Sequence, residues 1–122
     1  MPASNRTELE IRISQAIVRF EKEFMGRGPM ETRTWIIDDL VLVRLKNVLT
    51  PAEQQLASDE DSERGRILIK QLRQQLLERG RPMLEGIVKE TLGIPVKSLH
   101  TDISTRTGER IIVFTLERAY PN

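Results

Sequence analysis

The 122-residue sequence lacks cysteine and contains one histidine, one tryptophan and one tyrosine. Without cysteine the chain forms no disulfide, and it offers neither a thiolate ligand to a metal nor a thiol nucleophile. The histidine, His100, stands near Asp102, but no second histidine or carboxylate cluster accompanies the pair, so a plain strand histidine explains it better than metal or acid–base chemistry. We therefore expect no catalytic residue, no metal site and no cofactor, and hence a protein that is not an enzyme.

The sequence also lacks a long apolar run and an excess of one charge. No stretch approaches the roughly 18 apolar residues of a membrane-spanning helix, and the start does not resemble a signal peptide, so we expect a soluble, cytoplasmic protein without membrane insertion. Lys plus Arg number 19 and Asp plus Glu 18. This balance argues against nucleic acid as a partner, because nucleic-acid binders need many unneutralised cations. The length suits a single domain, residues 1–122, with one core.

The first half of the chain predicts a helix followed by a β-hairpin. Apolar residues recur every three or four positions over 7–25, the period of an amphipathic helix, and Gly26 suits a left-handed cap at its end. Strand-forming residues then occupy 32–46. Asp38-Asp39 divides them, and the short spacing makes the two strands antiparallel.

Two sites have the spacing of a capping box, in which a Thr hydroxyl and a Glu carboxylate satisfy free amides of the first helical turn. The first is Thr7 with Glu10, and the second is Thr50 with Glu53. The second site opens a helical segment predicted over 51–92.

Gly80-Arg81-Pro82 interrupts this helical segment. Proline removes a backbone hydrogen bond and clashes with the preceding turn, so the sequence predicts a kink or a break near Glu78 to Gly80. A second hairpin is predicted over 96–117. The apolar residues of the long helix are predicted to form one core stripe of Ile69, Leu72, Leu76, Met83 and Ile87, flanked by Leu68, Leu77, Leu84 and Val88.

The two halves repeat an order of helix, glycine, proline and two strands. In this repeat Leu40–Leu45 corresponds to Ile111–Leu116. We therefore predict an α+β fold of two helix–hairpin (αββ) units, with a four-stranded, mainly antiparallel sheet, helices on one face and one long kinked helix. The pattern leaves the strand order open.

Two stretches are candidates for binding an anion. Gly26, Arg27 and Gly28 could form a backbone nest with a counter-charge, or simply a helix cap and a turn. Arg66, Lys70 and Arg73 give the long helix a basic side, which could bind a polyanion or could be a solvated helix face diluted by glutamates.

The hairpin over 32–46 is the candidate for an interface. Leu40-Val41-Leu42-Val43 is apolar at both strand parities, which is typical of a strand covered on both sides. Helices would cover one side and a second subunit the other, so we predict a homodimer with Trp35, Val41 and Val43 at its interface.

Several motifs resemble the small bacterial MpsC-like family over about residues 8 to 117. They are Phe24–Pro29, the Asp38-Asp39 hairpin, Leu49–Leu56, Leu92–Val96 and Ile112–Glu117. The family is named after a sodium-translocating, membrane-potential-generating system, so the resemblance implies a link to membrane energisation or inorganic-carbon uptake. It supplies no catalytic residue.

Three functions remain after these exclusions. The first is a non-enzymatic accessory or regulatory interaction protein, with a protein partner in a membrane-associated system. The second is a module that binds nucleic acid or another polyanion through the basic helix side. The third is a sensor of an anion or nucleotide at Arg27.

Overall fold

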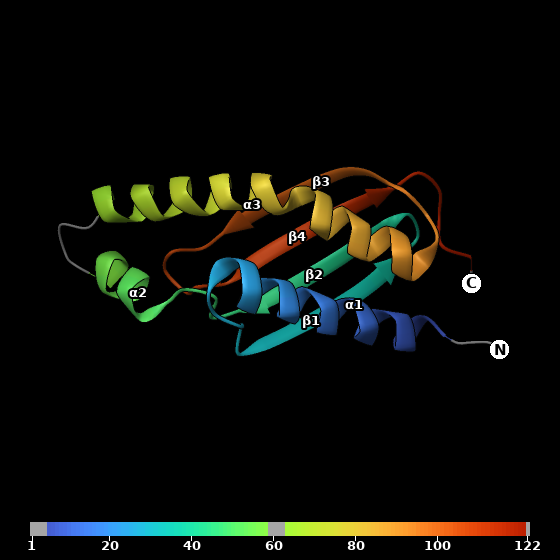
Figure 1. Cartoon of the computed structure of the whole chain (residues 1–122), viewed down its shortest axis with the longest axis horizontal. Helices are drawn as coiled ribbons and strands as arrows, with labels where there is room; N and C mark the ends of the chain where they lie inside the picture. Colours follow the sequence, from blue (N-terminus) through green and yellow to red (C-terminus); the bar gives the residue numbers. More distant parts are fainter. Residues whose placement is uncertain (1–4, 59–62, 122) are drawn as a thin grey trace.

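The computed structural model describes residues 5–58 and 63–121 as two layers, a sheet and the helices that cover one of its sides (Figure 1). This arrangement confirms the predicted α+β class. The helical elements are α1 (Arg6–Phe20), the π-helical segment η1 (Glu21–Met25), α2 (Pro51–Ser58) and α3 (Glu63–Leu92). The strands are β1 (Glu31–Ile37), β2 (Leu40–Lys46), β3 (Val96–Ile103) and β4 (Arg110–Leu116).

The four strands form one antiparallel sheet with the order β1-β2-β4-β3. Each hairpin contributes an outer and an inner strand, and the two inner strands, β2 and β4, lie side by side. The β1–β2 turn is the predicted Asp38-Asp39, in which Asp38 takes a positive φ of 59°. Aspartate tolerates this conformation better than most residues do.

The register between β2 and β4 agrees with the sequence repeat. Leu42 pairs with Val113, and these two positions also correspond to each other in the repeat. The two αββ units are therefore related by an approximate two-fold axis that passes through the Leu42–Val113 pair. The flanking pairs follow the same two-fold symmetry. The rotation converts the pair Leu40–Thr115 into the pair Arg44–Ile111, and the pair Val41–Phe114 into the pair Val43–Ile112.

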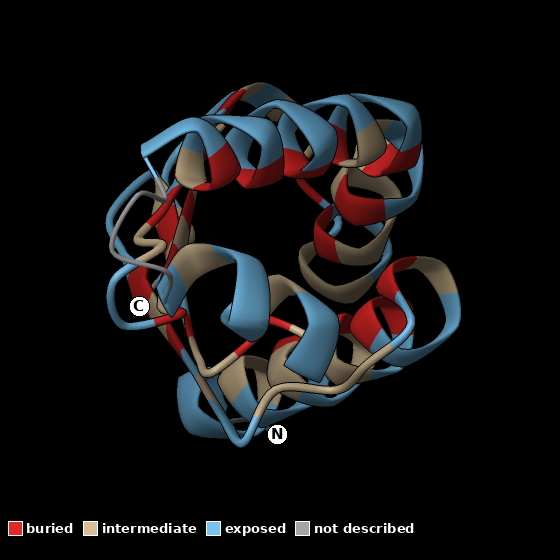
Figure 2. Ribbon diagram, turned by 90° about the vertical axis from the view of Figure 1, so that its left-hand side faces the viewer, coloured by how far each residue is buried: buried red, intermediate tan, exposed pale blue. Residues whose placement is uncertain are grey.

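The core lies between the sheet and the helices. Figure 2 shows the buried residues on the sides of these elements that face one another. Ile13 and Ile17 of α1, Leu84 and Val88 of α3 and Phe114 of β4 are fully buried. Removing such aliphatic surface from water is the main stabilising contribution to the fold.

The first helix ends at the predicted glycine, but its two ends differ from a plain helix with a capping box. Its last turn is π-helical, and Gly26 closes it with a φ of 91°. The capping box predicted at the start is wrong, because Asn5 occupies the cap position without a side-chain hydrogen bond. Glu10 instead accepts a 2.8 Å hydrogen bond from the Ile36 amide of the outer strand β1.

The long helix α3 runs through Pro82 without a break, and its axis changes direction near its middle (Figure 1). The alternative of a kink is therefore the one observed. Residues 59–62 of the predicted segment 51–92 lie outside the described residues. The second capping box is confirmed, since the Thr50 amide donates to Glu53 Oε1 and the Glu53 amide to Thr50 Oγ1, at 2.8 and 3.2 Å.

The predicted core stripe of α3 is in part wrong. Leu72 and Met83 are 51% and 48% exposed. The stripe that faces the core contains one arginine and two glycines, and consists of Gly65, Ile69, Arg73, Leu77, Gly80, Leu84 and Val88. Apolar residues alone do not identify this face.

Candidate functional site

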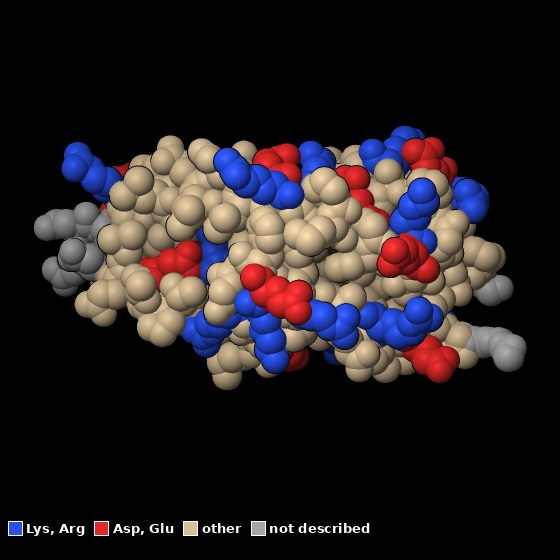
Figure 3. Space-filling model, in the orientation of Figure 1, with Lys and Arg blue, Asp and Glu red and all other residues tan. Residues whose placement is uncertain are grey.

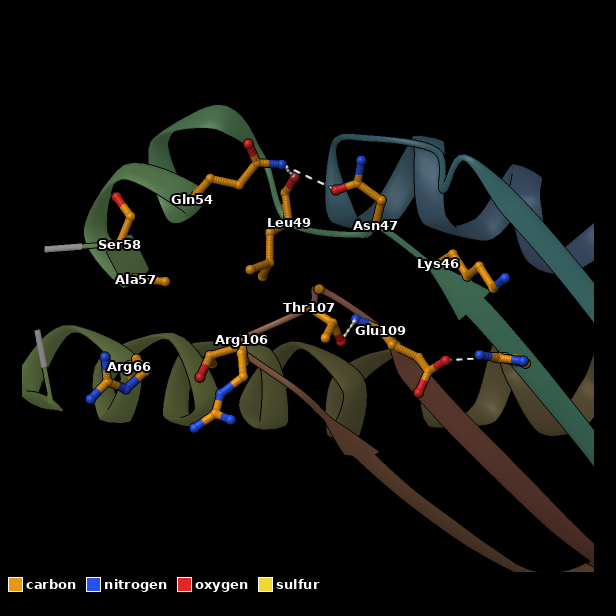
Figure 4. Close-up of a pocket in the computed structure, with 13 residues that line it drawn as sticks. Lys46, Asn47, Leu49, Gln54, Ala57, Ser58, Arg66, Arg106, Thr107 and Glu109 are labelled. Carbon is orange, nitrogen blue, oxygen red and sulfur yellow. Dashed lines mark hydrogen bonds and ion pairs between the residues drawn. The ribbon is translucent and has the colours of Figure 1, made fainter.

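A pocket of about 980 Å³ lies between α2, the N-terminal part of α3 and the β3–β4 loop. In the close-up of Figure 4, Arg66 and Arg106 lie at one end, Lys46 and Glu109 at the other, with Gln54 and Ser58 of α2 above them. The residues that line it are Arg44, Lys46, Asn47, Leu49, Gln54, Ala57, Ser58, Arg66, Thr105, Arg106, Thr107, Gly108 and Glu109. We call it the α2 pocket.

Cations from three parts of the fold line the α2 pocket. Arg44 and Lys46 come from β2, Arg66 from α3 and Arg106 from the β3–β4 loop, and Glu109 is the one described carboxylate among the lining residues. Four positive charges and one negative charge give the lining a net charge of +3. The whole chain carries +1, so the pocket concentrates positive charge.

Direct hydrogen bonds hold the walls of the α2 pocket together. Gly108, at a φ of 76°, accepts a 2.9 Å hydrogen bond from the Val48 amide, which joins the β3–β4 loop to the segment after β2. Gln54 Nε2 donates to Asn47 Oδ1 and to the Leu49 carbonyl, at 3.1 and 3.2 Å. The walls are therefore set before any ligand arrives.

Arg73 anchors α2 from beneath the pocket. This residue is 1% exposed. Its guanidinium donates two hydrogen bonds to the Glu53 carboxylate, from Nε to Oε2 at 3.0 Å and from Nη2 to Oε1 at 2.6 Å. The same Nη2 donates to the Val48 carbonyl at 2.9 Å. These hydrogen bonds with Arg73 and Thr50 hold the pKa of Glu53 below its ordinary value, although burial opposes them.

A second carboxylate lies deeper beside the same arginine. Glu21 Oε1 is 3.8 Å from Arg73 Nη1, and neither Glu21 oxygen makes a hydrogen bond with a described residue. Burial raises the pKa of Glu21, against the attraction of Arg110 and Arg73. Arg110 is also buried, its Nε and Nη2 have no hydrogen-bond partner among the described residues, and burial lowers its pKa.

The predicted basic side of α3 does not form one surface. Arg66 lines the α2 pocket, Lys70 pairs with Asp102 at 3.2 Å, and Arg73 lies in the core. The prediction of a continuous polyanion-binding side therefore needs correction, since a buried arginine cannot contact such a partner. Figure 3 shows cations and anions interspersed on the helix-covered side of the molecule.

The predicted Gly26-Arg27-Gly28 nest is engaged within the protein. Arg27 Nη1 donates a 2.6 Å hydrogen bond to the Leu49 carbonyl, which adds to the support of the pocket wall. A side chain at Gly28 would lie 2.9 Å from the aliphatic part of Lys22. Gly26 caps the helix. This stretch therefore supports the α2 pocket from outside.

The side of the sheet away from the helices carries an apolar patch. Trp35, Leu42 and Val113 form its middle row across three strands, in direct register. Arg33 lies over the Trp35 ring, 5.0 Å from its centre. We call this surface the open sheet face and define it by the half-buried or exposed residues Trp35, Ile37, Leu40, Leu42, Ile111 and Val113.

Of the three predicted interface residues, only Trp35 lies on the open sheet face. Val41 and Val43 are fully buried beneath the helices, so that part of the prediction is wrong. Side chains alternate along a strand, and it is Leu40 and Leu42 that point to the other side.

The residues of the α2 pocket suit binding better than group transfer. Arginine forks and a lysine recognise phosphate or carboxylate oxygens, and the amide and hydroxyl groups of Asn47, Gln54 and Thr107 add neutral donors and acceptors. No group of three His, Asp or Glu side chains among residues 5–58 and 63–121 is placed to hold a metal ion.

Sequence reasoning identified Arg66 and the corner at Arg27 but missed the rest of the pocket. Arg44 and Lys46 are spaced two apart on a strand, and Arg106 lies in a polar loop, yet nothing in their spacing shows that α2 closes over them. Glu21 and Arg110 were also missed, and Arg73 was expected on the basic side of the helix and is buried instead. They are ordinary charged residues in the sequence, and only the packing distinguishes them.

Comparison with known proteins gives two matches. A family model described as "Na+-translocating membrane potential-generating system (MpsC)" matches residues 5–118. The uncharacterized protein YbcI of Bacillus subtilis (strain 168) is 42% identical over 112 residues, which cover 92% of this chain and 88% of that protein. No solved structure matches. Within the described residues, no helix combines the length and hydrophobicity needed to cross a bilayer.

Proposed function

This chain belongs to the MpsC family, and we propose that it is a non-enzymatic accessory protein of a sodium-translocating system and acts as a homodimer. The family's description supplies the link to such a system. The observation that carries the proposal is the open sheet face, an apolar surface on β1, β2 and β4 with no described helix over it. Unpartnered apolar surfaces of this kind are typical of protein contacts.

The occupant of the open sheet face is a second copy of the chain. At one end of the strands lie Asp38 and Asp39 of the hairpin turn and Glu117 after β4, and Lys97 and Arg118 at the same end moderate its negative charge. At the other end lie Arg33, directly opposite Arg44 in the register, and Lys46. A copy rotated about a two-fold axis that runs across the strands brings each acidic end to a basic end, and places Leu42 over Leu42 of the other copy.

Other orientations bring like charges together. A two-fold axis along the strands would place acidic end against acidic end, which is destabilising. Closed, two-fold contacts are also the commonest symmetry of soluble homo-oligomers, because one patch serves both partners. Ion pairs within the chain, Arg44 with Glu109 and Lys46 with Glu31, moderate the positive end.

Sedimentation equilibrium over a concentration series tests the dimer. The wild-type chain should reach twice its 14.1 kDa mass. Leu42→Glu should shift the equilibrium to monomer, because it places a carboxylate at the centre of the interface. Leu72→Glu is the matched control, since Leu72 is 51% exposed on the outer side of α3.

Two results would contradict the proposal. One is a wild-type chain that stays monomeric throughout the series. The other is a dimer that Leu72→Glu dissociates and Leu42→Glu leaves intact, which would move the contact to α3. Circular dichroism of both variants checks that each is folded.

The accessory role has its own test in cells. Loss of the chain should lower the sodium-dependent membrane potential, measured with a voltage-sensitive dye. Wild type should restore the potential and Leu42→Glu should not. An unchanged potential in cells that lack the chain would contradict this role without affecting the dimer.

A further inference from the structure

We infer that the α2 pocket is a binding site for a small organic diphosphate. This site goes beyond the proposed function. It shares Arg44 and Lys46 with the basic end of the open sheet face, whereas Arg66 and Arg106 come from α3 and the β3–β4 loop. Its volume of about 980 Å³ lies within the range of small-molecule sites. A hollow of this kind suits a compact ligand, whereas a nucleic-acid strand would need an extended basic surface.

The charge of the pocket selects a multiply charged anion. The described lining residues carry a formal net +3, from Arg44, Lys46, Arg66 and Arg106 against Glu109, and the pairing of Lys46 with Glu31, outside the lining, reduces it to +2. Two adjacent phosphate groups supply a matching charge and several oxygens at once, and arginine forks bind such oxygens with two parallel hydrogen bonds.

Arg106 is the residue on which the inference rests most heavily. It is exposed on the β3–β4 loop and makes no hydrogen bond or ion pair with any described residue. Its guanidinium is therefore available to a ligand. Arg44 has part of its donor set engaged by Glu109, and the Lys46–Glu31 pair, at 3.6 Å between two exposed side chains, is weak and readily exchanged for a phosphate contact.

The opposite wall provides contacts for the organic part of the ligand. Gln54 and Asn47 present amide groups fixed by their mutual hydrogen bond, and Ala57 adds a small apolar surface. Because Arg27, Arg73 and Gly108 hold this wall through backbone carbonyl and amide groups, little reorganisation is needed on binding, which favours affinity.

Isothermal titration calorimetry with inorganic pyrophosphate and with ADP tests the inference. Both probes should bind the wild-type chain, and ADP more tightly if the organic part contributes. Arg106→Glu should raise both dissociation constants by about tenfold or more, which is the scale of one lost charge-assisted hydrogen bond. Arg12→Glu, an identical change on the exposed side of α1, should leave them unchanged.

Three outcomes would overturn the inference. They are the absence of binding by either probe at low salt, equal weakening by Arg106→Glu and Arg12→Glu, and binding to phosphatidylglycerol vesicles that ADP does not displace. The second would indicate general charge attraction and the third a lipid-headgroup surface. Arg106 lies outside the open sheet face, so sedimentation of Arg106→Glu should match wild type whether or not the ligand binds.

Discussion

Arg73 of α3 and Glu53 of α2 form a bidentate ion pair, at 2.6 and 3.0 Å, that joins the two helices. The pair lies under the α2 pocket, and Arg73 is almost fully buried. Together with the Val48 carbonyl, it fixes where α2 begins. The pocket therefore depends on a charge pair that does not itself line it.

Breaking this ion pair should destabilise the fold. Glu53→Gln removes the carboxylate that Arg73 holds through two hydrogen bonds and leaves Glu21, 3.8 Å away, as the remaining described carboxylate beside the buried charge, so the free energy of unfolding should fall by about 3 kcal/mol in urea denaturation at pH 7. Lys70→Met removes a pair between two exposed side chains, Lys70 and Asp102, and should cost at most about 1 kcal/mol. Equal losses in the two variants would show that burial of the Arg73 pair is unimportant.

Glu21 should give the stability a pH dependence of the opposite sign to that of an ordinary salt-bridged carboxylate. Burial raises its pKa above 4.5, so its protonated form is favoured in the folded state. That contribution is fully present below pH 4.5 and is lost as the pH rises through the raised pKa. The unfolding free energy of wild type relative to Glu21→Gln should therefore fall over this range, by about 1.4 kcal/mol for every tenfold difference in proton affinity between the folded and unfolded states.

Urea denaturation of both proteins at a series of pH values measures this difference. The contribution of Glu53 to stability has the opposite pH dependence. Because its pKa is lowered in the folded state, this contribution is present at pH values above the ordinary pKa of a glutamate and is lost only as the pH falls through the lowered pKa. The comparison with Glu21→Gln removes this effect because both proteins contain Glu53. A relative stability that rises with pH would contradict the assignment.

Gly80 should tolerate no side chain, whereas Gly86 should accept one. A Cβ at Gly80 would lie 2.5 Å from Cζ of Phe20, which stacks on Phe24. Gly80→Ala should therefore destabilise the fold by about 1–3 kcal/mol through overpacking. Gly86, on the same helix, has nothing within 4 Å, and Gly86→Ala should stabilise it by up to about 1 kcal/mol. Thermal denaturation of both variants checks the pair, and a loss at Gly86 equal to that at Gly80 would contradict it.

The sequence predicted the architecture better than the packing, and Gly80 shows why. Periodicity, glycine corners and the repeat of two αββ units predicted the helices, the hairpins and the antiparallel sheet. The core face of α3 was in part misplaced because Arg73 and Gly80 occupy it, and neither residue signals burial in a sequence. Leu72 and Met83 match the apolar period yet lie outside.

The candidate sites depended even more on tertiary contacts. Trp35 was expected at an interface and lies on the open sheet face, whereas Val41 and Val43 lie on the opposite side of the sheet. When both alternating sets of residues in a strand are apolar, as in Leu40 to Val43, the sequence does not show which set faces the helices. The α2 pocket combines residues from β2, α2, α3 and a loop, and no local pattern indicates that these segments meet.

The orientation of the proposed dimer predicts a charge-reversal result. Arg33→Glu and Asp39→Lys should each weaken dimerisation, because each puts like charges at one end of the open sheet face. The double variant should recover most of the affinity, because Glu at position 33 of one copy again lies near Lys at position 39 of the other. Dimer dissociation constants from sedimentation give the coupling. Additive losses in the double variant would rule out the antiparallel arrangement.

The central claim is that the open sheet face is buried against a second copy, and the single tryptophan of the chain reports on it directly. Trp35 lies on this face, so its fluorescence can be followed in the unmodified protein as concentration rises. We predict a shift of the emission to shorter wavelength and reduced quenching by acrylamide as dimer forms, with no such change in Leu42→Glu. Emission and quenching of wild type that stay constant across the sedimentation range would contradict the account.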